Sequence, residues 1–335
     1  MNIIKVMDPS NFRDSLSELF ERKIEIEGNF ISLDRQSKSP NQQQTNDAFS
    51  DKWSSYVESK EKERLYQFQR EWYLTLYGFA CEDELREHLS GCQTIFDAGC
   101  GLGYKAAWLA ELAPHALVIG MDFSTAAKQA AETYLSLSNL FFVQGDIADT
   151  GFHGGVFDYV NCDQVIMHTE NPEATFAELT RISRRPNGEI ACYFYAKKAL
   201  PRELLDDHFR TACSELSREE LWQMSEQLTE LGKRLTALNI SIDSPEIPSL
   251  GIKGGKQDIQ RFIYWNFLKC FWNEELGEET SVVTNYDWYS PSNARRFSEE
   301  EVHALAEENG LNETYFHAEE ACYSGRFACT NGAEN

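Results

Sequence analysis

The sequence predicts an α/β protein with a doubly wound, mostly parallel sheet of seven strands. Two observations carry this prediction. Between residues 94 and 195, apolar segments of strand length alternate with helix-forming runs, which is the pattern of parallel βαβ units. A long segment then separates the fifth strand from a closing helix and two more strand-like segments. The fold therefore includes N-terminal helices and a helical insertion after the fifth strand.

Seven segments supply the predicted strands. They are 94–98, 116–121, 140–144, 157–164, 189–195, 311–318 and 324–329. A helix is expected over 298–309, with Ser298 as its N-cap, because Glu299–Glu301 place negative charge at its positive end.

Four parts of the chain follow from these elements. Residues 1–90 are a helical extension with a polar linker near 36–50, where Gln, Asn and Ser dominate. Residues 91–197 form the central α/β core, and 198–297 form a mostly helical insertion long enough to be a dedicated wall or lid of a pocket. Residues 298–335 complete the sheet.

Composition and charge limit the class of protein. A chain of 335 residues can bury a substantial core, and no stretch is long enough for a membrane span. The start of the chain lacks the apolar core of a signal peptide, so a cytoplasmic protein is expected. The nine cysteines of the chain show no C-x-x-C spacing, so we expect reduced thiols and no metal site. The formal charge of −23 argues against nucleic-acid binding, which needs clustered Lys and Arg.

Residues 94–106 hold the most informative motif. An apolar strand runs into three glycines at alternate positions and then into a helix-forming run. Glycine permits a tight turn and leaves no Cβ to block a ligand that lies against the backbone. The free N–H groups at the helix start attract a negatively charged group. The motif predicts a cradle for a nucleotide-type cofactor.

Two kinds of cofactor suit this cradle. Counted from Gly101 the segment reads G-x-G-x-x-A, which is typical of dinucleotide sites, and counted from Asp97 it reads D-x-G-x-G-x-G. Further acids follow the next strands, namely Asp122 and Asp146, and polar residues lie over 161–164. Asp122 is expected to bind both ribose hydroxyls, because α/β sheets bind ligands at the carboxyl ends of their strands.

The pattern counted from Asp97, with the strand-end residues in this order, resembles class I S-adenosylmethionine-dependent methyltransferases. Residues 165–189 are also similar to the L-H-H-T-x-D-P…L-K-P-G-G stretch of many small-molecule methyltransferases. Met167 stands where a first His is common, and Asn187 replaces a Gly. The resemblance covers 94–195, and 281–330 more loosely.

The resemblance implies that S-adenosylmethionine is the cofactor. The glycines would admit its methionyl part, with Asp97 near the ammonium group. Asp146 would accept the adenine amino group, and the backbone N–H of Ile147 would meet the ring. The expected cofactor-binding residues are Asp97, Gly99, Gly101, Gly103, Asp122, Phe123, Asp146, Ile147 and Asp163.

Methyl transfer needs the nucleophile, the methyl carbon and the sulfur in line, so orientation supplies most of the acceleration. His168 is the candidate base, because it lies just beyond the fourth strand and an imidazole titrates near neutral pH. Its alternative role is to cap the next helix or position a loop. Asn161 and Asp163, at the strand end, are the other candidate catalytic residues.

The insertion interleaves aromatic rings with cations, which suits a small acceptor that carries an anionic group and an amine or an apolar body. Ordinary packing of an amphipathic helix is the alternative for most of these rings. The candidate substrate-binding residues are Gln164, Lys197, Arg261, Trp265, Tyr286 and Asp287.

The predicted function is methyl transfer to a nitrogen or oxygen atom of a small metabolite, with no nucleic-acid or membrane partner and with a homodimer left open. Methylation of a protein or an RNA is one alternative. The others are a non-catalytic S-adenosylmethionine-binding module and a dinucleotide-dependent oxidoreductase.

Overall fold

A computed structural model describes residues 12–33, 39–56 and 61–330. These residues divide into two compact units. Unit 1 contains 12–33, 69–195 and 297–330, and unit 2 contains 39–56, 61–68 and 196–296. Helix α3, Lys62–Leu76, contributes residues to both units.

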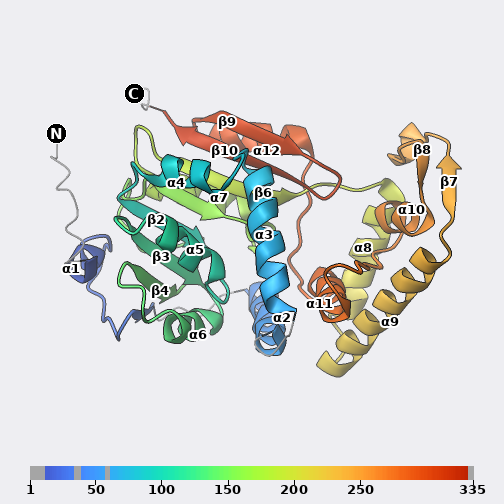
Figure 1. The fold of residues 1–335 in the computed structure, drawn as a ribbon, viewed down its shortest axis with the longest axis horizontal. Helices are drawn as coiled ribbons and strands as arrows, with labels where there is room; N and C mark the ends of the chain where they lie inside the picture. The colour runs from blue at the N-terminus through green and yellow to red at the C-terminus, as the bar shows by residue number, and fades with distance from the viewer. Residues whose placement is uncertain (1–11, 34–38, 57–60, 331–335) are drawn as a thin grey trace. The chain divides into compact units, whose positions relative to one another are not determined.

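An eight-stranded sheet forms the centre of unit 1 (Figure 1). The strand order is β1-β4-β3-β2-β5-β6-β10-β9. All neighbours from β1 to β6 pair in parallel, whereas β10 is antiparallel to both β6 and β9. The strands are β1 (Phe30–Ser32), β2 (Thr94–Ala98), β3 (Leu117–Asp122), β4 (Leu140–Gln144), β5 (Tyr159–Cys162), β6 (Glu189–Tyr195), β9 (Leu311–Ala318) and β10 (Cys322–Cys329).

The predicted fold class is confirmed, but the predicted number of strands is wrong by one. Strand β1 adds an edge to the sheet by pairing in parallel with β4, where Phe30 lies opposite Phe142. Three residues are too few to show the alternation that marks a strand in sequence. The other seven strands lie within or beside the predicted segments, and β2 is buried along its whole length.

Helices cover the sheet. Contacts place α5 on β2 to β4, α6 on β1, β3 and β4, and α12 on β9 and β10. The expected N-cap Ser298 is confirmed, because its hydroxyl accepts from the Glu301 backbone and the Glu301 side chain accepts from Ser298 in return. The helical segments are α1 (Phe12–Ser17), α4 (Glu82–Leu89), α5 (Tyr104–Leu112), α6 (Ala126–Thr133), the 3₁₀ turn η2 (Ile166–His168), α7 (Pro172–Ile182) and α12 (Glu299–Glu308).

Unit 2 is mostly helical. Its two short strands form a separate antiparallel pair, and a 3₁₀ turn lies between them in the chain. The elements are α2 (Pro40–Tyr56), α8 (Leu200–Cys213), α9 (Arg218–Ala237), β7 (Ser241–Ser244), η3 (Pro248–Leu250), β8 (Gly255–Asp258), α10 (Ile259–Asn266) and α11 (Glu278–Tyr289). No helix in the described ranges is both long enough and apolar enough to cross a membrane.

The expected polar linker near 36–50 is wrong for the part that the structure describes, because helix α2 begins at Pro40. Side chains one turn apart bond to each other, as Gln43 does to Asp47. Gln44 also reaches Ser290 and Ser292, and Lys52 pairs with Asp287 at 2.6 Å. Contacts with distant residues thus stabilise a helix whose own sequence has little apolar character. Residues 36–38 of the predicted linker lie outside the described residues.

Candidate functional site

The glycine motif forms the turn between β2 and α5. Gly99, Gly101 and Gly103 have φ of 77°, 52° and 78°, the left-handed region that glycine adopts without strain. A Cβ on Gly99 would lie 2.3 Å from Val165, and one on Gly103 would lie 2.6 Å from Phe142. Gly99 and Gly103 are therefore required for two reasons, their left-handed backbone and the lack of space for a side chain.

Asp122, at the end of β3, holds the glycine turn in place. Its Oδ2 accepts from the Gly101 backbone N–H at 2.8 Å. Its Oδ1 accepts from both the backbone and the hydroxyl of Ser124. Burial raises the pKa of the Asp122 carboxyl, and the bonds from Ser124 and Gly101 lower it in part. The carboxylate thus already ties β3 to the glycine turn.

Asp97, at the end of β2, is a buried acid with one free oxygen. Its Oδ1 accepts from the Asn161 amide at 2.6 Å, and the Asn161 oxygen accepts from the Tyr73 hydroxyl at 3.1 Å. Oδ2 has no hydrogen-bond partner within the part of the chain that the structure describes. Burial raises the pKa of the Asp97 carboxyl to about 6 in spite of the Asn161 bond. An oxygen of this kind is a ready acceptor for a cationic donor.

Asp163, just after β5, is fully engaged. Its carboxylate forms a buried ion pair with Lys105 of α5. It also accepts from the Tyr77 hydroxyl at 2.9 Å and from the Gln164 amide at 3.1 Å. These partners compensate the buried charge, and both carboxylate oxygens of Asp163 are engaged.

The segment after β5 places two further candidates. Gln164 has φ of 64°, which is strained for a residue with a side chain, and such strain tends to occur at functional sites. His168 lies in η2, is buried, and packs edge-on against Tyr195 with ring centroids 5.5 Å apart.

The remaining cofactor candidates follow β3 and β4. Asp146 Oδ1 accepts from the Ala148 backbone at 2.9 Å. Ile147 is buried in the main hydrophobic core, whereas Phe123 is only half-buried. The cofactor candidates of unit 1 all lie at the carboxyl ends of β2 to β5 or in the glycine turn.

The predicted substrate-binding residues other than Gln164 belong to unit 2. Arg261 lies over the Tyr264 ring, and Trp265 packs edge-on against the same ring. Tyr286 stacks on Trp222 with centroids 4.0 Å apart, and the Asp287 carboxylate pairs with Lys52. Lys197 is exposed. Tyr286 and Asp287 thus have partners inside unit 2.

Three residues that hold the acids of unit 1 were not among the predicted site residues. Lys105 is the one cation in helix α5, which is mainly apolar and is buried except at Glu111. A lone cation in such a helix was a usable signal. Tyr73 and Tyr77 are four residues apart on α3 and directly after it, so their hydroxyls can reach neighbouring strand ends. Their spacing alone is equally typical of core packing.

Comparison with known proteins identifies the core. Residues 96–192 match the family model described as a methyltransferase domain. An uncharacterised methyltransferase of Schizosaccharomyces pombe is 29% identical over 121 residues, which is 33% of this chain and 43% of that protein. Trans-aconitate 2-methyltransferase of Deinococcus radiodurans is 35% identical over 97 residues, which is 29% of this chain and 36% of that protein. The chain thus spans less than half the length of both relatives.

One solved structure, the magnesium protoporphyrin IX methyltransferase of Synechocystis PCC 6803 with bound SAH, is 16% identical to this chain. The match covers 86% of this chain and 97% of that one at a TM-score of 0.45, a likeness too low to add to the family match. The family assignment therefore depends on the matched core. Residues 96–192 therefore form a methyltransferase domain, and this core supports a class I S-adenosylmethionine-dependent methyltransferase with S-adenosylmethionine as its cofactor.

Proposed function

We propose that this chain transfers a methyl group from S-adenosylmethionine to a nitrogen or oxygen atom of a small metabolite. The observation that carries the proposal is the free, buried Oδ2 of Asp97 beside the glycine turn. A buried carboxylate oxygen without a donor is unfavourable in the empty protein. The ammonium group of the cofactor is a donor of the right charge to satisfy it.

The residues present fit the cofactor. Asp97 would accept from its ammonium group, and the backbone of Gly99, Gly101 and Gly103 would lie along its methionyl part. Asp122 and Phe123 would bind the ribose, and Asp146 and Ile147 the adenine. When bound, S-adenosylmethionine supplies a methyl group activated by its sulfonium centre.

The chain's own residues would then orient the acceptor and receive its proton. We assign the base to a ring nitrogen of His168, because the Asp163 carboxylate is already held by Lys105 and Tyr77. Asn161 uses both ends of its amide on Asp97 and Tyr73. We therefore assign positioning roles to Asn161, which holds Asp97, and to Asp163, which holds the end of β5. We assign Gln164 to contact with the acceptor.

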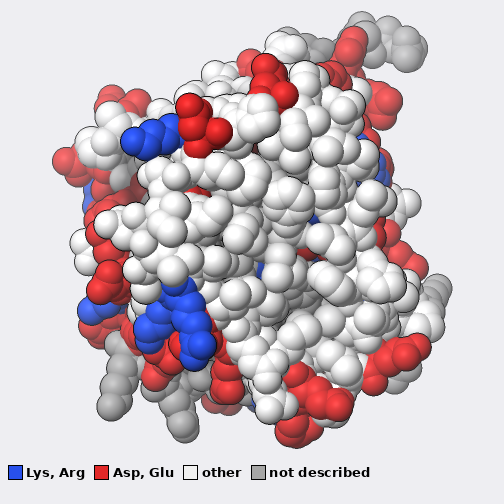
Figure 2. All heavy atoms as spheres, turned by 90° about the vertical axis from the view of Figure 1, so that its right-hand side faces the viewer, with Lys and Arg blue, Asp and Glu red and all other residues white. Residues whose placement is uncertain are grey.

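Charge supports a small acceptor over a nucleic acid. The chain carries a net charge of −23, and Figure 2 shows a face on which acidic side chains are spread and basic ones form only small groups. Phosphate backbones require clustered cations. The relative from Deinococcus radiodurans is named for a small molecule, trans-aconitate, which also favours a metabolite. We place the acceptor-binding residues in unit 2 and the protein in the cytoplasm, and a homodimer stays a prediction.

Isothermal titration calorimetry with S-adenosylmethionine, S-adenosylhomocysteine and NAD tests the cofactor. We expect the first two to bind. We also expect Asp97→Asn to weaken the binding of S-adenosylmethionine at least tenfold, because a charge-assisted hydrogen bond worth about 1.5–3 kcal/mol is lost. Asp83→Asn is the matched control, because the Asp83 side chain is 93% exposed and should leave affinity unchanged. Binding of NAD alone would overturn the proposal.

Labelled S-adenosylmethionine incubated with a cell extract tests the acceptor. Label in the fraction of small molecules is the expected result. If the label appears only in protein or RNA, the acceptor is a macromolecule and this part of the proposal is wrong.

A further inference from the structure

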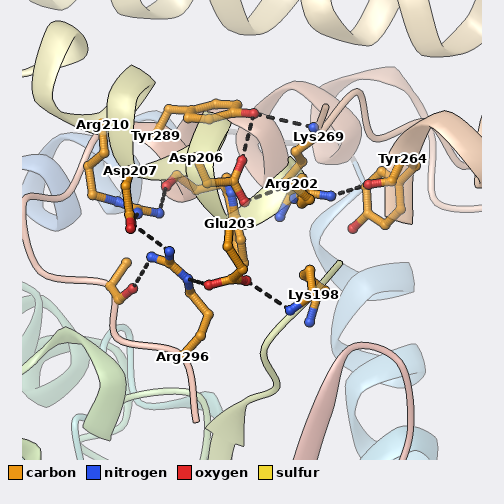
Figure 3. A network of polar contacts seen from close by, with 12 residues as sticks. Lys198, Arg202, Glu203, Asp206, Asp207, Arg210, Tyr264, Lys269, Tyr289 and Arg296 are labelled. Carbon is orange, nitrogen blue, oxygen red and sulfur yellow. Dashed lines mark hydrogen bonds and ion pairs between the residues drawn. The ribbon is translucent and has the colours of Figure 1, made fainter. Parts of the chain in front are cut away.

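Unit 2 contains a buried network of charged side chains (Figure 3). Arg202 and Asp206 lie one turn apart on α8 with 1% and 0% of their surface exposed, and they pair at 2.7 Å. The Tyr289 hydroxyl donates to Asp206 at 3.1 Å and accepts from the Lys269 backbone N–H at 3.2 Å. The backbone of Lys269 is therefore fixed against an ion pair that is already complete.

The side chain of Lys269 has no such partner. Only 6% of the residue is exposed. Its ammonium nitrogen lies 4.2 Å from the centre of the Trp288 ring, and it makes no hydrogen bond or ion pair with any residue of the described ranges. The nearest acids are taken, because Asp206 pairs with Arg202 and Asp287 pairs with Lys52.

Cations gather around one indole. Besides Lys269, the guanidinium carbons of Arg202 and Arg210 lie 5.2 Å and 5.8 Å from the Trp288 ring centre. Arg202 has Asp206 as its counter-ion, and Arg210 lies 3.9 Å from Asp207. Lys269 therefore leaves an excess of positive charge inside a protein whose net charge is −23.

A buried ammonium group without an anion is unstable in its charged form. The pKa of Lys269 is lowered to about 7, mainly by burial and also by the Arg202 and Lys198 charges. Asp287 on α11 and Asp206 on α8 raise it in part. Such a lysine gains most from a ligand that brings a negative charge into contact with it.

We propose that Lys269 and the Trp288 ring form a binding site in unit 2 for the carboxylate of a small molecule. This inference rests on the proposed function, in which that small molecule is the methyl acceptor. A carboxylate suits the site better than a phosphate dianion, because Asp206 and Asp287 lie nearby and repel a second negative charge. The Trp288 indole is itself buried beside the ammonium group, so the site has an apolar side, which suits a ligand with an apolar body next to its carboxylate.

Benzoate is the probe, and neutral benzamide is its matched control. We expect the full chain to bind benzoate at pH 7 at least tenfold more tightly than benzamide, as measured by calorimetry. Benzoate remains ionised above about pH 5, since carboxyl groups titrate near pH 4. Its affinity should therefore fall about tenfold for each pH unit above 7, where Lys269 loses its proton.

Lys269→Met keeps the length of the side chain and removes its charge. We expect this variant to bind benzoate and benzamide equally, with no change of affinity between pH 6 and 9. Lys233→Met is the matched control, because Lys233 also lies over an indole, Trp272, but pairs with Glu278 at the surface. It should retain the preference for benzoate.

Three results would overturn the proposal: no binding of benzoate, equal binding of benzoate and benzamide, or tighter binding of inorganic phosphate. If Lys269→Met does not fold, the benzoate affinity of the unaltered protein, measured against pH, tests the proposal instead. A benzoate affinity that does not change with pH would refute the role of Lys269. S-adenosylmethionine titrated into the same samples separates this inference from the proposed function. Loss of benzoate binding with intact cofactor binding refutes only the carboxylate site.

Discussion

The two units bury charge in opposite ways. In unit 1, Asp97 and Asp163 lie at adjacent strand ends. Lys105 pairs with Asp163, and one oxygen of Asp97 has no donor among the described residues. In unit 2, Arg202 and Lys269 lie around one indole, and the ammonium group of Lys269 has no acid of its own. One unit lacks a cation and the other lacks an anion.

This difference indicates where each unit would gain from binding a ligand. A buried pair such as Arg202–Asp206 is complete in itself and contributes to structure. A buried group with a missing partner is costly unless a ligand supplies it. The two incomplete groups, Asp97 and Lys269, are thus the positions where function is expected, and their pKa values are displaced in opposite directions.

The largest effect should come from breaking the complete pair. Arg202→Met leaves the Asp206 charge buried with the Tyr289 hydroxyl as its remaining donor, so urea unfolding should show a loss of about 3–5 kcal/mol. Lys105→Met should cost less, about 2 kcal/mol, because Asp163 keeps donors from Tyr77 and Gln164. A larger loss for Lys105→Met would contradict this ranking of the two networks.

The pH dependence of stability should have opposite signs in the two units. The pKa of Asp97 is raised from 3.8 to about 6, so its contribution to stability is present below about pH 4 and is lost as pH rises through 6. The pKa of Lys269 is lowered from 10.5 to about 7, so its contribution is present at high pH and is lost as pH falls through 7.

Variants isolate these two contributions. Relative to the unaltered chain, Asp97→Asn should gain stability between pH 4 and 6, by about 3 kcal/mol at most. Lys269→Met should instead lose relative stability between pH 7 and 10. Denaturant unfolding measured at each pH checks both, and parallel curves for a variant and the unaltered chain would show that its group does not titrate as described.

The smallest effects should come from two buried hydroxyls. Tyr289→Phe removes a donor to a charged carboxylate and should cost about 2 kcal/mol in thermal unfolding. Tyr73→Phe removes bonds to Tyr159 and Asn161, which are neutral, and should cost about 1 kcal/mol. Equal losses would mean that the charge of Asp206 does not strengthen its bond.

Local signals were enough to predict much of unit 1. A strand, three glycines and a helix start are contiguous, so 94–106 could be read directly, and the cap at Ser298 needs only four residues. The partners of the acids could not be read in this way. Tyr77 and Asp163 are 86 positions apart, and Lys105 and Asp163 are 58 apart.

Unit 2 was harder to predict because its stability depends on contacts between distant segments. Helix α2 has a polar sequence typical of a loop, and its bonds to Ser290, Ser292 and Asp287 become visible only in the fold. Lys269 looks like any surface lysine in sequence, and only the arrangement of α8, α11 and the chain after α10 buries it. Cations and rings could be predicted for this region, but their pairing could not.

The bonds that Asp122 makes have a consequence for how a ligand enters unit 1. With Gly101 and Ser124 anchored on one carboxylate, the turn already has a single shape before any ligand arrives. Little backbone freedom remains to be frozen on binding, so association should proceed without a slow rearrangement of the turn. The main chain over 99–103 should therefore superimpose between the empty and the loaded protein.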